Sequence, residues 1–107
     1  MDAAKRARLE AKGWKIGTVA EFFELTPEES ALVEIKLALS RTLRERRETQ
    51  MPQAQLAGRI GSSQPRVAKA EGGDGSVSMH LLIRAMLATG ATPQDIGKAI
   101  AGVRVAA

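Results

Sequence analysis

The sequence predicts an all-α protein of a single domain, and three observations support this. Strand signals are almost absent, because β-branched and aromatic residues never alternate over more than a few positions. Candidate capping boxes at Thr18, Thr26 and Thr92, each followed three residues later by a carboxylate, mark helix starts. The length of 107 residues suits one domain with one core.

The first helical elements are an N-terminal arm and one long helix. We predict a short helix from Ala3 to Lys12 and one or two turns from Val19 to Glu24. A helix from Pro27 to about Glu48 follows, because Thr26 can cap it and proline is well tolerated at the first helical position. Apolar residues recur every three to four positions along it, which predicts one buried stripe: Leu32, Ile35, Leu39 and Leu43.

Two short helices come next, from about Pro52 to Ile60 and from Gln64 to Glu71. Three residues separate them, so they must cross steeply. Gly61 supplies the positive φ of such a turn, and Ser63 can cap the second helix. Ala57 is small enough for the second helix to approach. The residues expected to face the core are Leu56, Ile60, Val67 and Ala70.

A glycine-rich loop and two further helices complete the predicted fold. The loop contains Gly72, Gly73 and Gly75. Ser78 can cap a helix from Met79 to Thr89, with Gly90 suited to the left-handed residue after it. Thr92 and Asp95 form the capping box of a last helix, from Pro93 to about Gly102.

Composition excludes several kinds of protein. There is no cysteine and one histidine, His80, so thiolate metal sites, multi-histidine metal sites and cysteine nucleophiles are excluded. No nucleophile with its base and no phosphate loop is present, so we expect neither an enzyme nor a cofactor. No apolar run reaches the roughly 18 residues of a membrane span, and the basic start lacks the apolar region of a signal peptide. We therefore expect a protein of the cytoplasm with no membrane contact.

Charge is distributed unevenly along the chain. The net charge is +4, but the segment 36–71 contains eight basic and three acidic residues, whereas 17–35 contains five glutamates and no base. A basic block suits polyanion binding, although a solvated face with mixed ion pairs is the commoner explanation. The glutamates fit either a helix start or an acidic protein-binding surface.

The second short helix presents an outward face suited to the DNA major groove. Glutamine can bond adenine and arginine can bond guanine through two hydrogen bonds each. The outward residues are Gln64, Pro65, Arg66 and Lys69. Arginines that precede or lie within the first short helix stand where contacts to the DNA backbone are expected: Arg44, Arg46, Arg47 and Arg59.

The stretch from about Lys36 to Ile100 resembles the XRE, or Cro/cI-type, helix-turn-helix family. The family signature is matched at fixed spacing by Gln53, Leu56, Ala57, Gly61, Ser63, Gln64, Val67, Glu71 and Gly73. The resemblance implies a five-helix, lambda repressor-like DNA-binding domain that dimerises on a near-palindromic operator. Where the family has Gly, Leu and Thr before the first glutamine, this chain has Gln50, Met51 and Pro52, so we expect a rearranged link there.

The resemblance also implies roles for single residues. Gln64, Pro65, Arg66 and Lys69 would contact bases. Phosphate contacts would come from Gln53, Arg59, Ser62, Ser63 and Gly73. A structural ion pair would join Arg46 to Glu71. The apolar residues of the last helix, which fit the core or a dimer seam, would share in the dimer interface: Ile96, Ile100 and Val103.

The whole chain is similar in architecture to HigA-type antitoxins, which repress their own operon and neutralise a RelE-fold (HigB-type) toxin. This implies an N-terminal extension, 1–30, before a helix-turn-helix domain, 31–107. All three aromatics lie in the extension and either cover the bundle or bind a toxin: Trp14, Phe22 and Phe23. The alternatives are a repressor without a toxin, and an adaptor that binds protein and not DNA.

Overall fold

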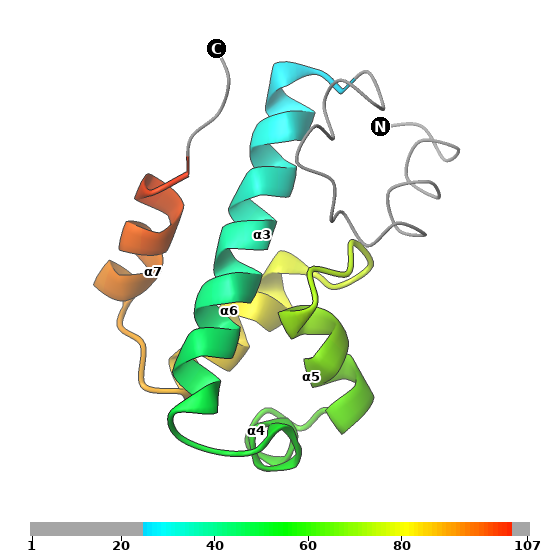
Figure 1. Cartoon of the computed structure of the whole chain (residues 1–107), viewed down its shortest axis with the longest axis vertical. Helices are drawn as coiled ribbons and strands as arrows, with labels where there is room; N and C mark the ends of the chain where they lie inside the picture. Colours follow the sequence, from blue (N-terminus) through cyan, green and yellow to red (C-terminus); the bar gives the residue numbers. More distant parts are fainter. Residues whose placement is uncertain (1–24, 104–107) are drawn as a thin grey trace.

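The computed structural model describes residues 25–103, and these form helices without any strand (Figure 1). This confirms the all-α prediction for the described part of the chain. The predicted helices within 1–24, the Thr18 capping box and the three aromatics lie outside the described residues. The helices are α3 (Pro27–Glu48), α4 (Gln53–Arg59), α5 (Gln64–Glu71), α6 (Met79–Ala88) and α7 (Pro93–Ala101).

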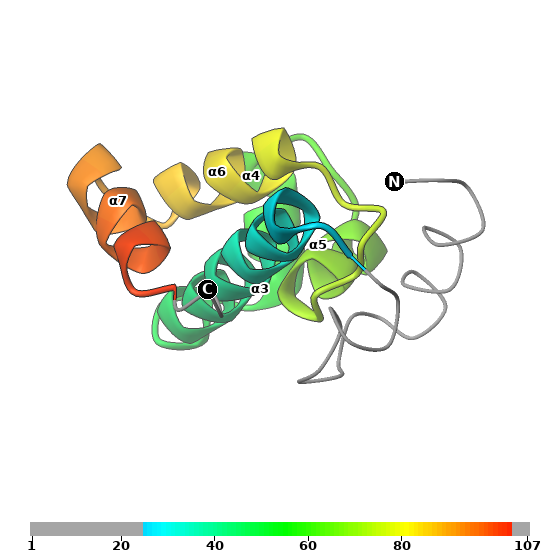
Figure 2. The ribbon, with the colours of Figure 1, turned by 90° about the horizontal axis from the view of Figure 1, so that it is seen from above.

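Helix α3 is the central element of the fold. Seen along this helix, α7 lies at one side of it, α5 at the other, and α6 runs between them (Figure 2). Both predicted capping boxes in the described chain are present. Glu29 N–H donates to Thr26 Oγ1 at 3.1 Å, and Thr26 N–H donates to the Glu29 carboxylate at 2.9 Å. Thr92 and Asp95 make the same two bonds at the start of α7.

The core is aliphatic and lies where α3 meets α5, α6 and α7, with α4 packed against α5 and α6. Every residue of the short helices predicted to face inward is buried. One prediction for α3 was wrong: Leu32 is 49% exposed, and its neighbour Val33 is buried instead. The first turns of α3, which include Leu32, extend past the other helices of the described chain (Figure 1).

The turn between α4 and α5 has the predicted construction. Gly61 has a φ of 61°, in the left-handed region that a Cβ disfavours. Ser63 caps α5 by accepting from Arg66 N–H at 3.4 Å. The glycine after α6, Gly90, also has a positive φ, of 88°.

The link between α3 and α4 is tied to the end of α3. Met51 N–H donates to the Arg47 carbonyl at 2.9 Å, and the Met51 side chain is buried in the core. Pro52 has extended backbone angles and precedes α4, which therefore begins one residue later than predicted. The link thus fixes the position of Gln53 relative to α3.

No helix in the described residues combines the length and apolar character that crossing a membrane requires.

Candidate nucleic-acid interface

Helix α5 buries one side and exposes the other. Val67, Ala70 and Glu71 are buried. The predicted base-contacting residues are all exposed, and Ala68 is exposed between them, a position that sequence reasoning missed. Helical spacing alone could have found Ala68, since it lies four residues after Gln64 on the same face. The exposed residues are Gln64, Pro65, Arg66, Ala68 and Lys69.

Two of the predicted phosphate contacts are not presented to solvent. Ser62 Oγ is buried without a hydrogen-bond partner in the described chain, and Ser62 N–H donates to the Ala57 carbonyl at 2.9 Å. Gly73 is buried, with a φ of 75°, whereas its neighbour Gly72 is exposed. Ser63 is exposed but its hydroxyl already caps α5. The predicted contacts through Ser62 and Gly73 are therefore not supported by this conformation.

The buried ion pair involves Arg47 and not Arg46, so that prediction was wrong by one residue. Arg47 Nε and Nη2 donate to the two Glu71 carboxylate oxygens at 2.6 and 2.8 Å. The side chain of Glu71 is only 3% exposed. Hydrogen bonding to Glu71 raises the pKa of the Arg47 guanidinium above its usual value. A two-pronged, buried pair of this kind fixes the end of α5 against α3.

Arg46 faces a different part of the fold. Its Nε donates to Thr89 Oγ1 at 3.1 Å, its Nη2 donates to the Thr89 carbonyl at 3.5 Å, and its Nη1 lies 4.0 Å from the Asp95 carboxylate. Successive residues of an α-helix point about 100° apart. Arg47 therefore faces α5 while Arg46 reaches the end of α6 and the start of α7.

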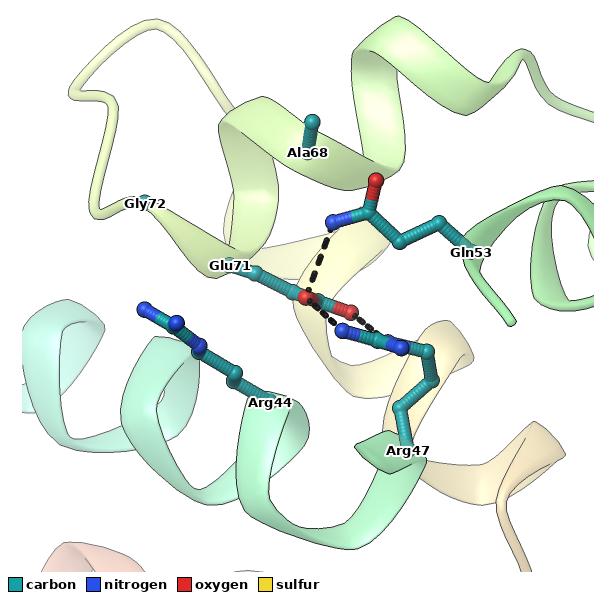
Figure 3. Close-up of a pocket in the computed structure, with 6 residues that line it drawn as sticks. All are labelled: Arg44, Arg47, Gln53, Ala68, Glu71 and Gly72. Carbon is teal, nitrogen blue, oxygen red and sulfur yellow. Dashed lines mark hydrogen bonds and ion pairs between the residues drawn. The ribbon is translucent and has the colours of Figure 1, made fainter. Parts of the chain in front are cut away.

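Gln53, predicted to contact phosphate, belongs to the same cluster as the buried pair. Its amide Nε2 donates to Glu71 Oε1 at 3.1 Å, so one carboxylate receives donors from α3 and from α4 (Figure 3). An amide carries two N–H donors. The bond to Glu71 occupies one of them and orients the side chain at the start of α4.

Three further basic residues donate to backbone carbonyls and so stabilise the fold: Lys36 and Arg59 of the segment 36–71, and Arg84 on α6. Arg59 donates to the Ala88 carbonyl at 3.3 Å, and Arg84 donates to the Ile60 carbonyl at 2.8 Å, so α4 and α6 cap each other's last turn. Lys36 donates to the Gly75 carbonyl at 3.3 Å. Cations at helix C-termini complement the helix dipole. The predicted phosphate contact of Arg59 thus competes with a structural bond.

The remaining cations of the segment 36–71 lie on α3 and α5. Arg41, Arg66 and Lys69 make no side-chain hydrogen bond or ion pair within residues 25–103. Arg44 pairs only with Glu48, at 2.7 Å, and both side chains are more than half exposed. Within the segment 36–71, these four cations are the ones available to an external anion, and Lys98 is a further exposed cation on α7.

A shallow pocket lies between α3, the start of α4 and the end of α5 (Figure 3). Its volume is about 240 Å³, and it is lined by Arg44, Arg47, Gln53, Ala68, Glu71 and Gly72. A second hollow of about 350 Å³ shares Arg44 with it and includes Arg41, Leu37 and Ser40. In the loop between α5 and α6, hydrogen bonds from Ser76 lower the pKa of the Asp74 carboxyl.

The predicted dimer residues differ in their exposure. Ile96 is buried in the core, Ile100 is 36% exposed, and Val103 is half-buried. His80 is exposed. The described residues contain no group of His, Cys, Asp or Glu that could hold a metal ion.

Comparisons with protein-family models, with curated proteins and with solved structures found no match to this chain.

Proposed function

We propose that this chain is a sequence-specific DNA-binding regulator of transcription, acting as a repressor, with α5 entering the major groove. The observation that carries the proposal is the exposed face of α5. This short helix is fixed on one side by the core and by the Arg47–Glu71 pair. On the other side it presents Gln64 and Arg66, whose side chain has no partner within the described residues 25–103.

The chemistry of this face favours base reading over a purely structural hairpin. Glutamine and arginine are the side chains that recognise adenine and guanine through paired hydrogen bonds. Ala68 adds a small apolar surface that can contact a thymine methyl group. If the helix pair α4–α5 served only for packing, its exposed side would not require this combination of side chains.

Arg66→Ala tests this proposal. Duplexes enriched from random DNA by the wild-type protein give a preferred site, and fluorescence anisotropy measures affinity for that site and for a scrambled duplex. Loss of Arg66 should weaken binding to the preferred site by about 1–3 kcal/mol and relax specificity at one base pair. Affinity for the scrambled duplex should change much less.

Lys98→Ala is the matched control, because it removes one exposed positive charge from α7, away from α5. It should leave the preference for the selected site unchanged. Failure of the wild-type protein to enrich any sequence would contradict the proposal and leave the adaptor interpretation.

A further inference from the structure

An exposed apolar side chain on α6 lies beside two arginines. Leu87, on the last turn of α6, is 47% exposed. Ile83 precedes it by one turn on the same side of the helix and is only half-buried. Arg84 is exposed between them in sequence, and Arg59 reaches the same end of α6 from α4. These four residues, which we call the Leu87 face, combine an apolar centre with positive charge.

The fold holds both arginines in place and leaves them able to bind a partner. Arg84 donates to the Ile60 carbonyl at 2.8 Å, and Arg59 donates to the Ala88 carbonyl at 3.3 Å. A guanidinium carries five N–H donors, so each arginine keeps others available. Neither α4 nor α6 contains an acidic residue; within residues 25–103 the carboxylates belong to α3, α5, the loop after α5, and α7. The Leu87 face therefore suits an acidic segment that carries apolar side chains.

The chain itself contains a segment with these properties. Residues 21–24 are Glu21, Phe22, Phe23 and Glu24, two aromatics between two carboxylates. They lie outside the described residues. Carboxylates pair with arginine through two parallel hydrogen bonds, and phenylalanine buries a large apolar area against aliphatic side chains. The sequence of this segment thus complements the Leu87 face in both charge and apolar character.

The segment is too short to reach the Leu87 face of its own chain. It joins α3 at Pro27, whereas the Leu87 end of α6 lies near the opposite end of α3, where Arg46 donates to Thr89 Oγ1 at 3.1 Å. From Pro27 to Arg46, α3 rises about 28 Å. Phe22 precedes Pro27 by five residues. Such a stretch spans at most about 18 Å when fully extended. A second copy of the chain must therefore supply the segment.

We propose that residues 21–24 of one copy bind the Leu87 face of a second copy. The two phenylalanines contact Leu87 and Ile83, and the two glutamates pair with Arg59 and Arg84. In a two-fold pair, each chain gives one segment and receives one, so the contact closes without leaving an unpaired site. The contact does not use the exposed face of α5, so it does not depend on the proposed function.

Cysteine cross-linking tests this contact, because the chain has no cysteine of its own. Ala20→Cys and Ala88→Cys, which leave every proposed contact residue in place, are made as separate full-length proteins, one with a size tag. After mixing under mild oxidation, their mixed disulfide should form roughly tenfold faster than that of Ala20→Cys with Lys98→Cys, because the contact raises the effective concentration of the thiols. Electrophoresis without reductant measures the rates.

Charge reversal identifies the groups that hold the segment. Glu21→Lys with Glu24→Lys, added to the Ala20→Cys protein, should lower the rate to that of the Lys98→Cys mixture, because the lysines face arginines. Glu28→Lys with Glu45→Lys makes the same charge change at exposed positions of α3 and should keep the faster rate.

The apolar centre is tested on the receiving copy. Leu87→Gln, added to the Ala88→Cys protein, should slow the mixed disulfide, because the phenylalanines lose their main contact. Leu32→Gln changes a similarly exposed leucine, 49% exposed on α3, and should leave the rate unchanged. Both variants should keep the urea midpoint of their parent protein, since neither leucine is buried.

Three outcomes would overturn the proposal. The first is a mixed disulfide with Ala88→Cys that forms no faster than the one with Lys98→Cys. The second is a rate advantage that survives reversal of Glu21 and Glu24. The third is a chain carrying both Ala20→Cys and Ala88→Cys that closes its disulfide within itself faster than between copies. Failure of the wild-type protein to bind DNA, with the rate advantage intact, would overturn only the proposed function.

Discussion

The carboxylate of Glu71 connects three helices. It belongs to α5, it accepts two hydrogen bonds from Arg47 on α3, and it accepts one from Gln53 on α4. Because this carboxylate is buried, losing any of these bonds should destabilise the folded state, since a buried charge without its partner is poorly solvated. The orientation of α5, the helix proposed to enter the major groove, therefore depends on the Glu71 side chain.

A double-mutant cycle on Arg47 and Glu71 should measure this dependence. Arg47→Met or Glu71→Gln alone should lower the free energy of unfolding by roughly 3 kcal/mol, as for other buried pairs broken from one side. Their coupling should be on the order of 2 kcal/mol. Urea unfolding followed by circular dichroism gives these values.

The same cycle with Arg46→Met is the control. Arg46 contacts Thr89 and Asp95, so its loss should destabilise the protein but show no coupling to Glu71. Coupling of Glu71 to Arg46 and not to Arg47 would contradict the observed pair.

At the scale of the element, the capping box at the start of α3 makes the stability of this helix sensitive to acid. The pKa of the Glu29 carboxyl is lowered from 4.5 to about 2, and the hydrogen bond from Thr26 N–H is the largest of the causes. A carboxylate whose pKa is lower in the folded state stabilises that state above its unfolded pKa. This stabilisation is therefore present above about pH 4.5 and is lost as the pH falls towards 2.

Glu29→Gln should reduce this acid sensitivity. Glutamine can replace glutamate in a capping box but does not titrate. The urea midpoint of the variant should therefore fall less than that of the wild type between pH 5 and pH 2, a window set by the usual and lowered pKa values. Equal losses in the two proteins would show that Glu29 does not contribute.

Within residues 25–103, the helix boundaries were predicted to within one residue because caps are local. Ser63, Ser78 and the two threonine boxes act on backbone groups three residues away, and those relationships are visible in the sequence. The partner of Glu71 was not predictable in this way. Arg46 and Arg47 are adjacent, and the rotation of α3 and the Thr49–Pro52 link decide which of them faces α5.

The candidate site was predicted in part. The exposed polar face of α5 follows from helical periodicity, and all four predicted side chains lie on it. Ala68 was not predicted, because its methyl side chain carries no hydrogen-bonding group that would mark it as a base contact. The burial of Ser62 Oγ and Gly73 depends on how α4, α5 and the following loop pack, which no local pattern encodes.

At the scale of the whole molecule, the dimer that the resemblance implies should depend on the exposed edge of α7. Ile100→Glu should dissociate the dimer while leaving helix content unchanged, because Ile100 is 36% exposed in the single chain. Sedimentation velocity measures the change, and Gln94→Glu, on another exposed face of α7, adds the same charge as a control. A protein that remains dimeric after Ile100→Glu would place the seam elsewhere.

The antitoxin role that the resemblance implies concerns the N-terminal arm. If that role holds, residues 1–24 should be needed to retain a co-expressed toxin during purification and should not be needed for DNA binding. Anisotropy on the selected duplex checks the second part with the 25–107 fragment. Equal toxin retention by the fragment and the full chain would show that the arm is not the binding segment.

The reciprocal bonds Arg59–Ala88 and Arg84–Ile60 affect how a mutational survey of this protein should be interpreted. Replacing either arginine by alanine removes a cap from a helix that orients α5, so reduced DNA affinity would follow from altered folding. The number of arginines therefore overstates the surface available for the proposed contact with DNA. Measuring stability beside affinity for every arginine variant separates the arginines that hold the bundle together from those that contact a ligand.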